Sequence, residues 1–118
     1  MSEPLGALRQ VIVPVADVVQ AAEAIAAQLG LELRFRDGDR WAAFDAGGLT
    51  LALAGPGEQP AGGGIALGVK VADLDAALER VAAEGGEVLE DVREGEHERR
   101  ATCRDRFGAT LALYQSLG

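Results

Sequence analysis

The chain has 118 residues and a formal net charge of -8, with 11 basic against 19 acidic side chains. That length fits one domain with its own core and excludes two full-sized domains. The acidic balance argues against nucleic acid as a partner, and no apolar run approaches the roughly 20 residues of a membrane-spanning helix. We therefore expect a single domain over residues 1–118 that binds neither nucleic acid nor a membrane.

The first residues and the use of cysteine favour a cytoplasmic protein. Residues 1–4 have neither the basic nor the apolar character of a signal peptide. A single cysteine, Cys103, excludes an internal disulfide and is typical of a reducing compartment. With His97 as the one histidine, we do not expect a zinc site built from several His or Cys ligands.

Two segments recur in the same order along the chain. Residues 13–18 (VPVADV) return as VKVADL at 69–74, and residues 48–53 (GLTLAL) return as GATLAL at 108–113. The second match lies four residues later in register, so the second half carries a longer loop before its last strands. The pattern predicts two related units joined by a flexible Gly- and Pro-rich linker. We place them at about 8–54 and 65–115, with the linker at 55–64.

Each unit is predicted to have the order βαβββ. In the first, the apolar and β-branched residues 8–15 indicate a strand, and Asp17 caps a helix over 18–29 that ends at Gly30. Three strands follow at about 31–36, 40–45 and 49–54, with hairpin turns at Asp37-Gly38 and Gly47-Gly48.

In the second unit Asp73 caps a helix over 74–83 that ends at Gly85-Gly86. Its strands are predicted at about 87–92, 97–104 and 109–115. A lone unit would expose one apolar face of its sheet, so we expect the two units to assemble.

The alternation of side chains along the strands separates two faces of the predicted sheet. Bulky aliphatic residues at odd positions of the first and last strand of each unit are expected to pack on the helices. The even positions are mostly small or polar: Gln10, Ile12, Thr50, Ala52, Ala54, Ala66, Gly68, Lys70, Thr110, Ala112 and Tyr114. A curved sheet with these residues on its concave side forms a cleft, the usual place for a ligand.

The hairpin at Gly47-Gly48 decides where Trp41 lies. A two-residue loop puts Trp41 on the cleft face with Ala52, whereas a three-residue loop sends it to the helix side. We adopt the two-residue loop, and repeat symmetry then places Cys103 in the cleft as well. Trp41 and Tyr114 would either stack on a flat aromatic ligand or pack in a core or dimer interface.

Few other residues offer chemistry. His97 lies in a charged turn and is either solvated or a general base or lone ligand beside glutamates. Cys103 is either an inert buried residue or a nucleophile, but no base partner is visible. The arginines between residues 93 and 106 either protect an exposed edge or guide an anionic ligand. Gly62–Gly64 lack the Lys-Ser/Thr of a phosphate loop and read as linker.

Taken together, these residues resemble the vicinal oxygen chelate superfamily, also called the glyoxalase/bleomycin-resistance/extradiol-dioxygenase fold. The resemblance is carried by the strand–Asp–Ala-rich helix pattern at Val11–Gly30 and Val69–Gly86. Residues 104–108 (RDRFG) are similar to the family's Asp-Pro-x-Gly turn without its proline. The implied fold is α+β, with two βαβββ repeats forming a curved mixed sheet, a concave cleft and helices on the outer face. The resemblance also implies a homodimer, with or without exchange of units through the linker.

In metal-dependent members of this family the cleft holds a divalent ion on the first and last strands of each unit. The resemblance puts those positions at Gln10, Ala52, Ala66 and Ala112. Alanine offers no donor, and one amide oxygen does not hold Mn, Fe, Ni or Zn. We therefore expect no metal, no cofactor and no catalytic residues.

The reading that follows is a metal-free small-molecule-binding protein, resembling bleomycin-resistance proteins, that sequesters a drug or an aromatic metabolite. The residues expected to contact the ligand are Gln10, Trp41, Ala52, Ala66, Lys70, Cys103, Ala112 and Tyr114. Two alternatives stay open. One is a metal-dependent lyase, isomerase or dioxygenase whose ion is held atypically by Gln10, His97 and acidic residues. The other is an interaction module with a vestigial cleft.

Overall fold

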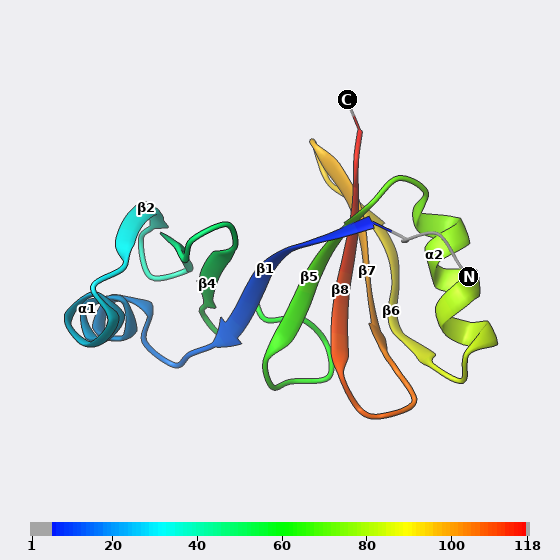
Figure 1. Ribbon diagram of the computed structural model, residues 1–118, viewed down its shortest axis with the longest axis horizontal. Coiled ribbons are helices and arrows are strands. Elements are labelled where there is room, and N and C mark those ends of the chain that lie inside the picture. The colour runs from blue at the N-terminus through cyan, green and yellow to red at the C-terminus, as the bar shows by residue number, and fades with distance from the viewer. Residues whose placement is uncertain (1–5, 118) are drawn as a thin grey trace.

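An eight-stranded sheet carries two helices in the computed structural model, which describes residues 6–117 (Figure 1). The first half of the chain forms β1 (Gly6–Pro14), α1 (Val18–Leu29), β2 (Glu32–Asp37), β3 (Trp41–Asp45) and β4 (Thr50–Ala54). The second half forms β5 (Ala66–Val71), α2 (Leu74–Ala83), β6 (Glu87–Glu94), β7 (Glu98–Arg104) and β8 (Thr110–Ser116). These are the elements predicted from the sequence, with ends that differ by one or two residues.

The centre of the sheet is a seam between one strand from each half. β1 and β5 pair antiparallel there. Outward from β1 the order is β4, β3, β2, and outward from β5 it is β8, β7, β6. The β1–β4 and β5–β8 pairs are parallel and the outer pairs are antiparallel, so the sheet is mixed.

Both helices begin at the aspartates that the sequence predicts as caps. Asp17 Oδ1 accepts a hydrogen bond from Gln20 N–H at 3.0 Å, and Asp73 Oδ1 accepts one from Ala76 N–H at 3.1 Å. Such side-chain oxygens satisfy amides that have no partner inside the helix. α1 ends at Gly30, whose φ of 66° lies in the left-handed region that glycine adopts without strain.

Each helix covers the strands of its own half, which gives two apolar cores on one face of the sheet. α1 packs against a cluster that includes Phe44 and Leu53, and α2 against one that includes Leu113. A third cluster lies on the opposite face and crosses the seam. Its members are Ile12, Ala52, Ala54 and Ala66, with Trp41 and Ala112 packed against it. Packing on the helix-free face therefore connects the two halves of the sheet.

Residues 55–64, predicted as a flexible linker, are held to the sheet by side-chain hydrogen bonds. Gln59 Nε2 donates to the carbonyl oxygens of Val15 and Ala54, each at 3.2 Å. Arg104 Nη2 donates to Gly62 O at 3.1 Å. The segment is therefore a fixed crossover that contacts strands of both halves.

Within residues 6–117, neither helix is long and apolar enough to span a membrane.

Candidate functional site

The helix-free face of the sheet is hollowed into a pocket of ≈ 470 Å³ between the two halves. That volume falls in the range of small-molecule sites. The floor is lined by Gln10, Ile12 and Ala112. One wall is lined by Phe35, Asp37, Arg40, Trp41, Gly57, Glu58, Gln59 and Pro60. The other wall includes Glu90, Arg93, Glu98, Arg100, Thr102 and Tyr114.

Gln10 lies on the floor with its side chain across Gly68, its partner in register on β5. A Cβ atom at Gly68 would come 2.4 Å from Gln10 Cγ, so only glycine leaves room for this side chain. The Gln10 amide makes no hydrogen bond to any other described residue. Both its donor and its acceptor are therefore free for a ligand.

Trp41 lies on the pocket face, as the two-residue turn predicts. Ala46 N–H donates to Leu49 O at 2.8 Å, which closes the turn across Gly47-Gly48. Both glycines have positive φ, 79° and 102°, as a tight hairpin turn of this kind requires. Trp41 consequently pairs with Ala54 and lines the first wall. Tyr114, also predicted for the cleft, lines the opposite wall.

The prediction that Cys103 faces the cleft is wrong, and the cause is a turn. The β7–β8 turn has three residues, Arg106-Phe107-Gly108, closed by a hydrogen bond of 3.0 Å from Asp105 N–H to Ala109 O. The extra residue shifts the pairing, so Cys103 stands opposite Leu111 on the helix side. Thr102, opposite Ala112, takes the pocket position instead.

Cys103 is fully buried in the core beneath α2. Burial raises the pKa of its thiol. A buried thiol with a raised pKa is a poor nucleophile, which favours the inert role over the catalytic one.

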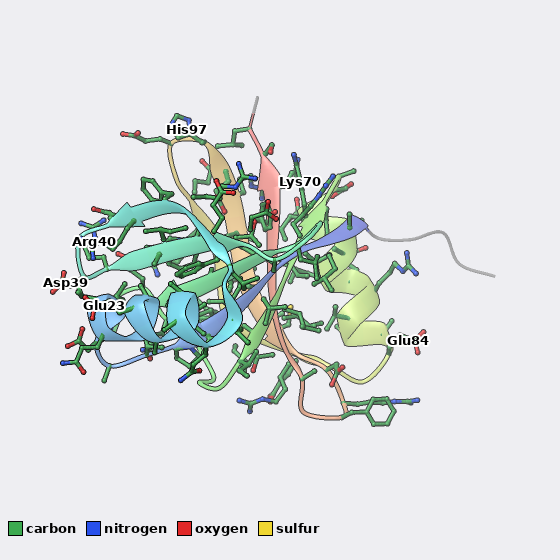
Figure 2. All side chains as sticks on the ribbon, turned by 60° about the vertical axis from the view of Figure 1, so that its left-hand side comes forward. Glu23, Asp39, Arg40, Lys70, Glu84 and His97 are labelled. Carbon is green, nitrogen blue, oxygen red and sulfur yellow. The ribbon has the colours of Figure 1, made fainter. Side chains whose placement is uncertain are left out.

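The remaining predicted contacts lie at different depths. Ala112 lines the floor, whereas Ala52 and Ala66 are fully buried beneath it and shape the floor without lining the pocket. Lys70 is exposed on β5 opposite Tyr114, outside the set of lining residues, and lies beside β8 (Figure 2). Of the eight predicted contacts, Gln10, Trp41, Ala112 and Tyr114 line the pocket.

The four positions that the resemblance assigns to a metal come together at the seam. Ile12 pairs with Ala52 and Ala66, and Gly68 pairs with Gln10 and Ala112. Three methyl groups and one amide do not supply the several oxygen or nitrogen donors that a divalent ion needs. Among residues 6–117, no group of three or more His, Cys, Asp or Glu side chains is placed to hold a metal.

The position of His97 does not fit the atypical metal site considered above. It lies at the tip of the β6–β7 hairpin and points away from the sheet (Figure 2). Its side chain is 92% exposed and contacts Glu96 at 3.8 Å, and it does not line the pocket. The solvated reading of His97 therefore fits the structure.

Ion pairs fix much of the charged lining. Arg40 contacts Asp37 at 3.3 Å and Glu58 at 3.7 Å, which ties the crossover to the β2–β3 hairpin. On the opposite wall Arg93 contacts Glu90 at 2.9 Å. Such exposed pairs contribute little to stability, but they decide which charges remain free for a ligand.

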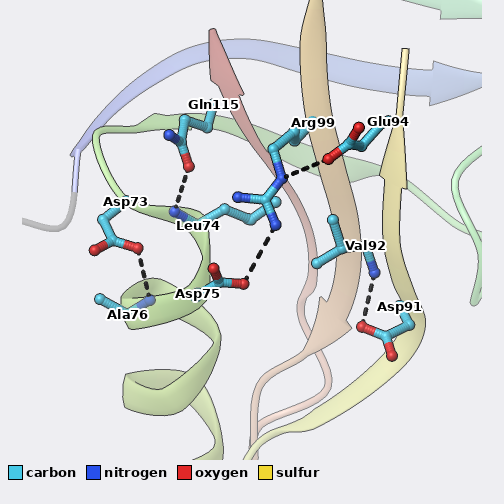
Figure 3. A network of polar contacts seen from close by, with 9 residues as sticks. All are labelled: Asp73, Leu74, Asp75, Ala76, Asp91, Val92, Glu94, Arg99 and Gln115. Atoms are coloured by element: carbon cyan, nitrogen blue, oxygen red, sulfur yellow. Dashed lines mark hydrogen bonds and ion pairs between the residues drawn. The ribbon is translucent and has the colours of Figure 1, made fainter. Parts of the chain in front are cut away.

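Gln115 and Arg99 point to the helix face of the sheet and are held there by polar contacts (Figure 3). Gln115 Oε1 accepts a hydrogen bond from Leu74 N–H at 2.8 Å at the start of α2. Arg99 contacts Asp75 at 3.5 Å and Glu94 at 3.6 Å. Because successive residues of a strand point to opposite faces, these contacts keep Tyr114 and Arg100 on the pocket side.

The sequence did not predict most of the charged residues that line the two walls of the pocket. The arginine-rich segment was the one signal for Arg93 and Arg100. Glu58 and Gln59 gave no signal, because their segment has the composition of a linker.

The comparisons with known proteins agree with this architecture. Residues 10–114 match the model of the glyoxalase-like domain family. The chain is 44% identical to an uncharacterized protein of Mycolicibacterium smegmatis over 89 residues, 75% of this chain and 77% of the other.

Two solved structures are similar at low identity. One is a glyoxalase/bleomycin resistance protein/dioxygenase superfamily member from Vibrio splendidus, 18% identical with a TM-score of 0.71, covering 92% of this chain and 99% of that one. Methylmalonyl-CoA epimerase from Mycobacterium tuberculosis is 24% identical with a TM-score of 0.72, covering 100% and 93%. These likenesses show the shared fold. The match over residues 10–114 shows that the chain belongs to the glyoxalase-like domain family.

Proposed function

We propose that this protein binds a small organic molecule in the pocket between its two halves, without a metal ion held by the pocket floor. The observation that carries the proposal is the chemistry of that floor. Where metal-dependent relatives would need donors, this chain has Ala52, Ala66 and Ala112, with Gln10 as the single polar group. The floor is therefore suited to apolar contact and one amide hydrogen bond.

The walls support binding of a flat ligand. Trp41 and Tyr114 face the pocket from opposite halves and offer aromatic surfaces that stack on planar molecules. Gln10 adds an amide whose donor and acceptor have no partner among residues 6–117. The role that we propose for these contacts is to sequester a drug or an aromatic metabolite.

Metal content and metal response test the first half of the proposal. Untagged protein is analysed by mass spectrometry and its melting temperature is measured with added Mn, Fe, Co, Ni and Zn salts. We expect substoichiometric metal and an unchanged melting temperature. A tightly held ion at one per chain would contradict the proposal and favour the metal-dependent lyase, isomerase or dioxygenase.

Binding is tested by NMR with planar aromatic compounds, following the indole N–H of Trp41, the single tryptophan of the chain. Ala112→Leu places a larger side chain on the floor and should weaken binding. Ala24→Leu on the exposed side of α1 is the matched control and should leave binding unchanged. If no compound of a diverse set binds, the vestigial-cleft reading replaces this one.

A cytoplasmic homodimer also remains a proposal. It is supported by the exposed side chains of Leu29 and Leu33, which a second copy would cover. Light scattering on the purified protein measures the oligomeric state, and a monomer at micromolar concentration would contradict it.

A further inference from the structure

A row of basic side chains crosses the second half of the sheet on the pocket face. Lys70 on β5 pairs with Tyr114 on β8, Tyr114 pairs with Arg100 on β7, and Arg100 pairs with Arg93 on β6. Neighbouring strands are about 4.8 Å apart, so the row extends over about 14 Å. We call Lys70, Arg93 and Arg100 the basic row.

The basic row runs against both the composition of the chain and the usual rules of sheet pairing. The chain has 11 basic and 19 acidic residues, yet three of the basic ones stand in one row across four strands, with Tyr114 between Lys70 and Arg100. Arg93 and Arg100 are directly opposite one another, and like charges in that position destabilise a sheet. An unfavourable pairing of like charges that lies at a pocket wall points to a role in binding rather than in folding.

Within the described chain, two members of the row have no counter-ion. Arg93 is paired with Glu90 at 2.9 Å, but neither Arg100 nor Lys70 has a carboxylate within ion-pair distance. Glu98 faces the same pocket two residues before Arg100 and is the other uncompensated charge on this wall. On the lining of this wall, Arg93 and Arg100 stand against Glu90 and Glu98, and Lys70, exposed on β5 just outside the lining, adds a third cation to the row.

The opposite wall has the reverse balance. There Asp37 and Glu58 share the single guanidinium of Arg40. Trp41 stands on this wall as well. The pocket is therefore polarised, with a positive end at Arg100 and a negative, aromatic end at Trp41.

Tyr114 stands in the middle of the basic row as a hydrogen-bond donor. Its partial burial, and then the nearby carboxylate of Glu98, raise the pKa of its hydroxyl, while Arg9 lowers it. The net direction is upward, so the hydroxyl keeps its proton at neutral pH.

From this arrangement we infer that the ligand is an aromatic carboxylate, with its anionic group at Arg100, Lys70 and Tyr114 and its ring system against Trp41. The inference rests on the proposed function and names the class of ligand. A carboxylate matches the fork of a guanidinium, and Lys70 adds a point charge. Glu90 and Glu98 disfavour a polyanion such as a polyphosphate, so a single negative charge is selected.

Three probes with the same ring system separate the contribution of charge to affinity from that of the ring: 2-naphthoate, 2-naphthamide and 2-naphthylmethylammonium. Their dissociation constants are measured by NMR titration of the labelled protein at low salt. We expect 2-naphthoate to bind about tenfold more tightly than 2-naphthamide, the size of one charge-assisted contact. The ammonium probe should bind more weakly than both.

Arg100→Gln should weaken 2-naphthoate about tenfold and change 2-naphthamide by less than about twofold. Arg100→Lys keeps the charge but loses the two-pronged guanidinium, so its affinity for 2-naphthoate should lie between those of the unchanged protein and Arg100→Gln. Arg36→Gln is the matched control, because it removes the same charge from β2 at a position that does not line the pocket. It should change neither constant. The NMR spectrum of each variant shows whether it is folded.

Equal or tighter binding of the amide or the ammonium would overturn the inference and leave small-molecule binding intact. A loss of affinity for all three probes in Arg100→Gln would also overturn it, because the side chain would then act on the shape of the pocket. If none of the three probes binds, the inference fails, and the wider compound set described above decides whether small-molecule binding fails with it.

Discussion

The side chain of Gln10 covers Gly68 across the seam between β1 and β5, and the two residues are partners in register. The contact links the halves of the sheet at the floor of the pocket. It also sets the direction of the Gln10 amide, because the side chain lies flat over a backbone without a Cβ atom.

Gly68→Ala tests this contact. The added Cβ would lie 2.4 Å from Gln10 Cγ, so the glutamine must turn away or the strands must shift. We expect a loss of about 1–3 kcal/mol in the free energy of unfolding, measured by denaturant titration. Gly57→Ala is the control, since a Cβ atom there meets nothing within 4 Å.

The double variant Gln10→Ala/Gly68→Ala should recover most of that loss, because the colliding side chain is gone. A double variant no more stable than Gly68→Ala would show that the alanine strains the backbone rather than displacing Gln10.

Gln59→Ala should loosen the wall formed by the crossover. The side chain donates to the carbonyl oxygens of Val15 and Ala54, where β1 and β4 end. Losing both bonds should lower the free energy of unfolding by about 1–2 kcal/mol. Hydrogen exchange should also become faster in residues 55–60. Gln28→Ala, on the exposed end of α1, should leave both measurements unchanged.

The thiol of Cys103 should resist alkylation in the native protein. It is fully buried and its pKa is raised by burial, so little thiolate is present or accessible near pH 8. Iodoacetamide, followed by mass spectrometry, should modify the native chain far more slowly than the chain unfolded in urea. Because this is the single cysteine of the chain, the readout is unambiguous. Comparable rates in the two states would contradict the placement of Cys103 beneath α2.

The β2–β3 pair should respond to acid through Asp45. Arg34 Nη2 donates to Asp45 Oδ2 at 2.6 Å, and this bond, followed by that from Gly47 N–H, holds the pKa of the carboxyl below its ordinary value of 3.8. A lowered folded-state pKa contributes stability that is present above 3.8 and is lost as the pH falls through the folded value.

Carboxyl NMR titration measures this shift directly. Arg34→Gln should raise the pKa of Asp45 towards its ordinary value but not fully, because the bond from Gly47 N–H remains. Asp45→Asn should flatten the acid limb of the stability curve. An unchanged Asp45 pKa in Arg34→Gln would contradict the contact.

The sequence predicts the elements and the two faces of the central strands because both depend on local signals. Asp17 and Asp73 mark where the helices begin, and period-two alternation sorts Val13 from Ile12. Cys103 was misplaced because the face of β7 depends on the number of residues in the turn that follows it. The pocket role of Gln59 depends on contacts 44 residues away, which local pattern does not encode.

The length of the β7–β8 turn decides which side chains of β7 face the pocket. Trp41 on β3 and Arg100 on β7 hold equivalent places, each opposite the fifth residue of the next strand. With three residues in this turn, Arg100 and Thr102 face the pocket and Cys103 faces the core beneath α2. Adding or removing one residue in this turn would therefore exchange all the side chains that β7 presents to the pocket at once, whereas substitutions would have to replace them one by one.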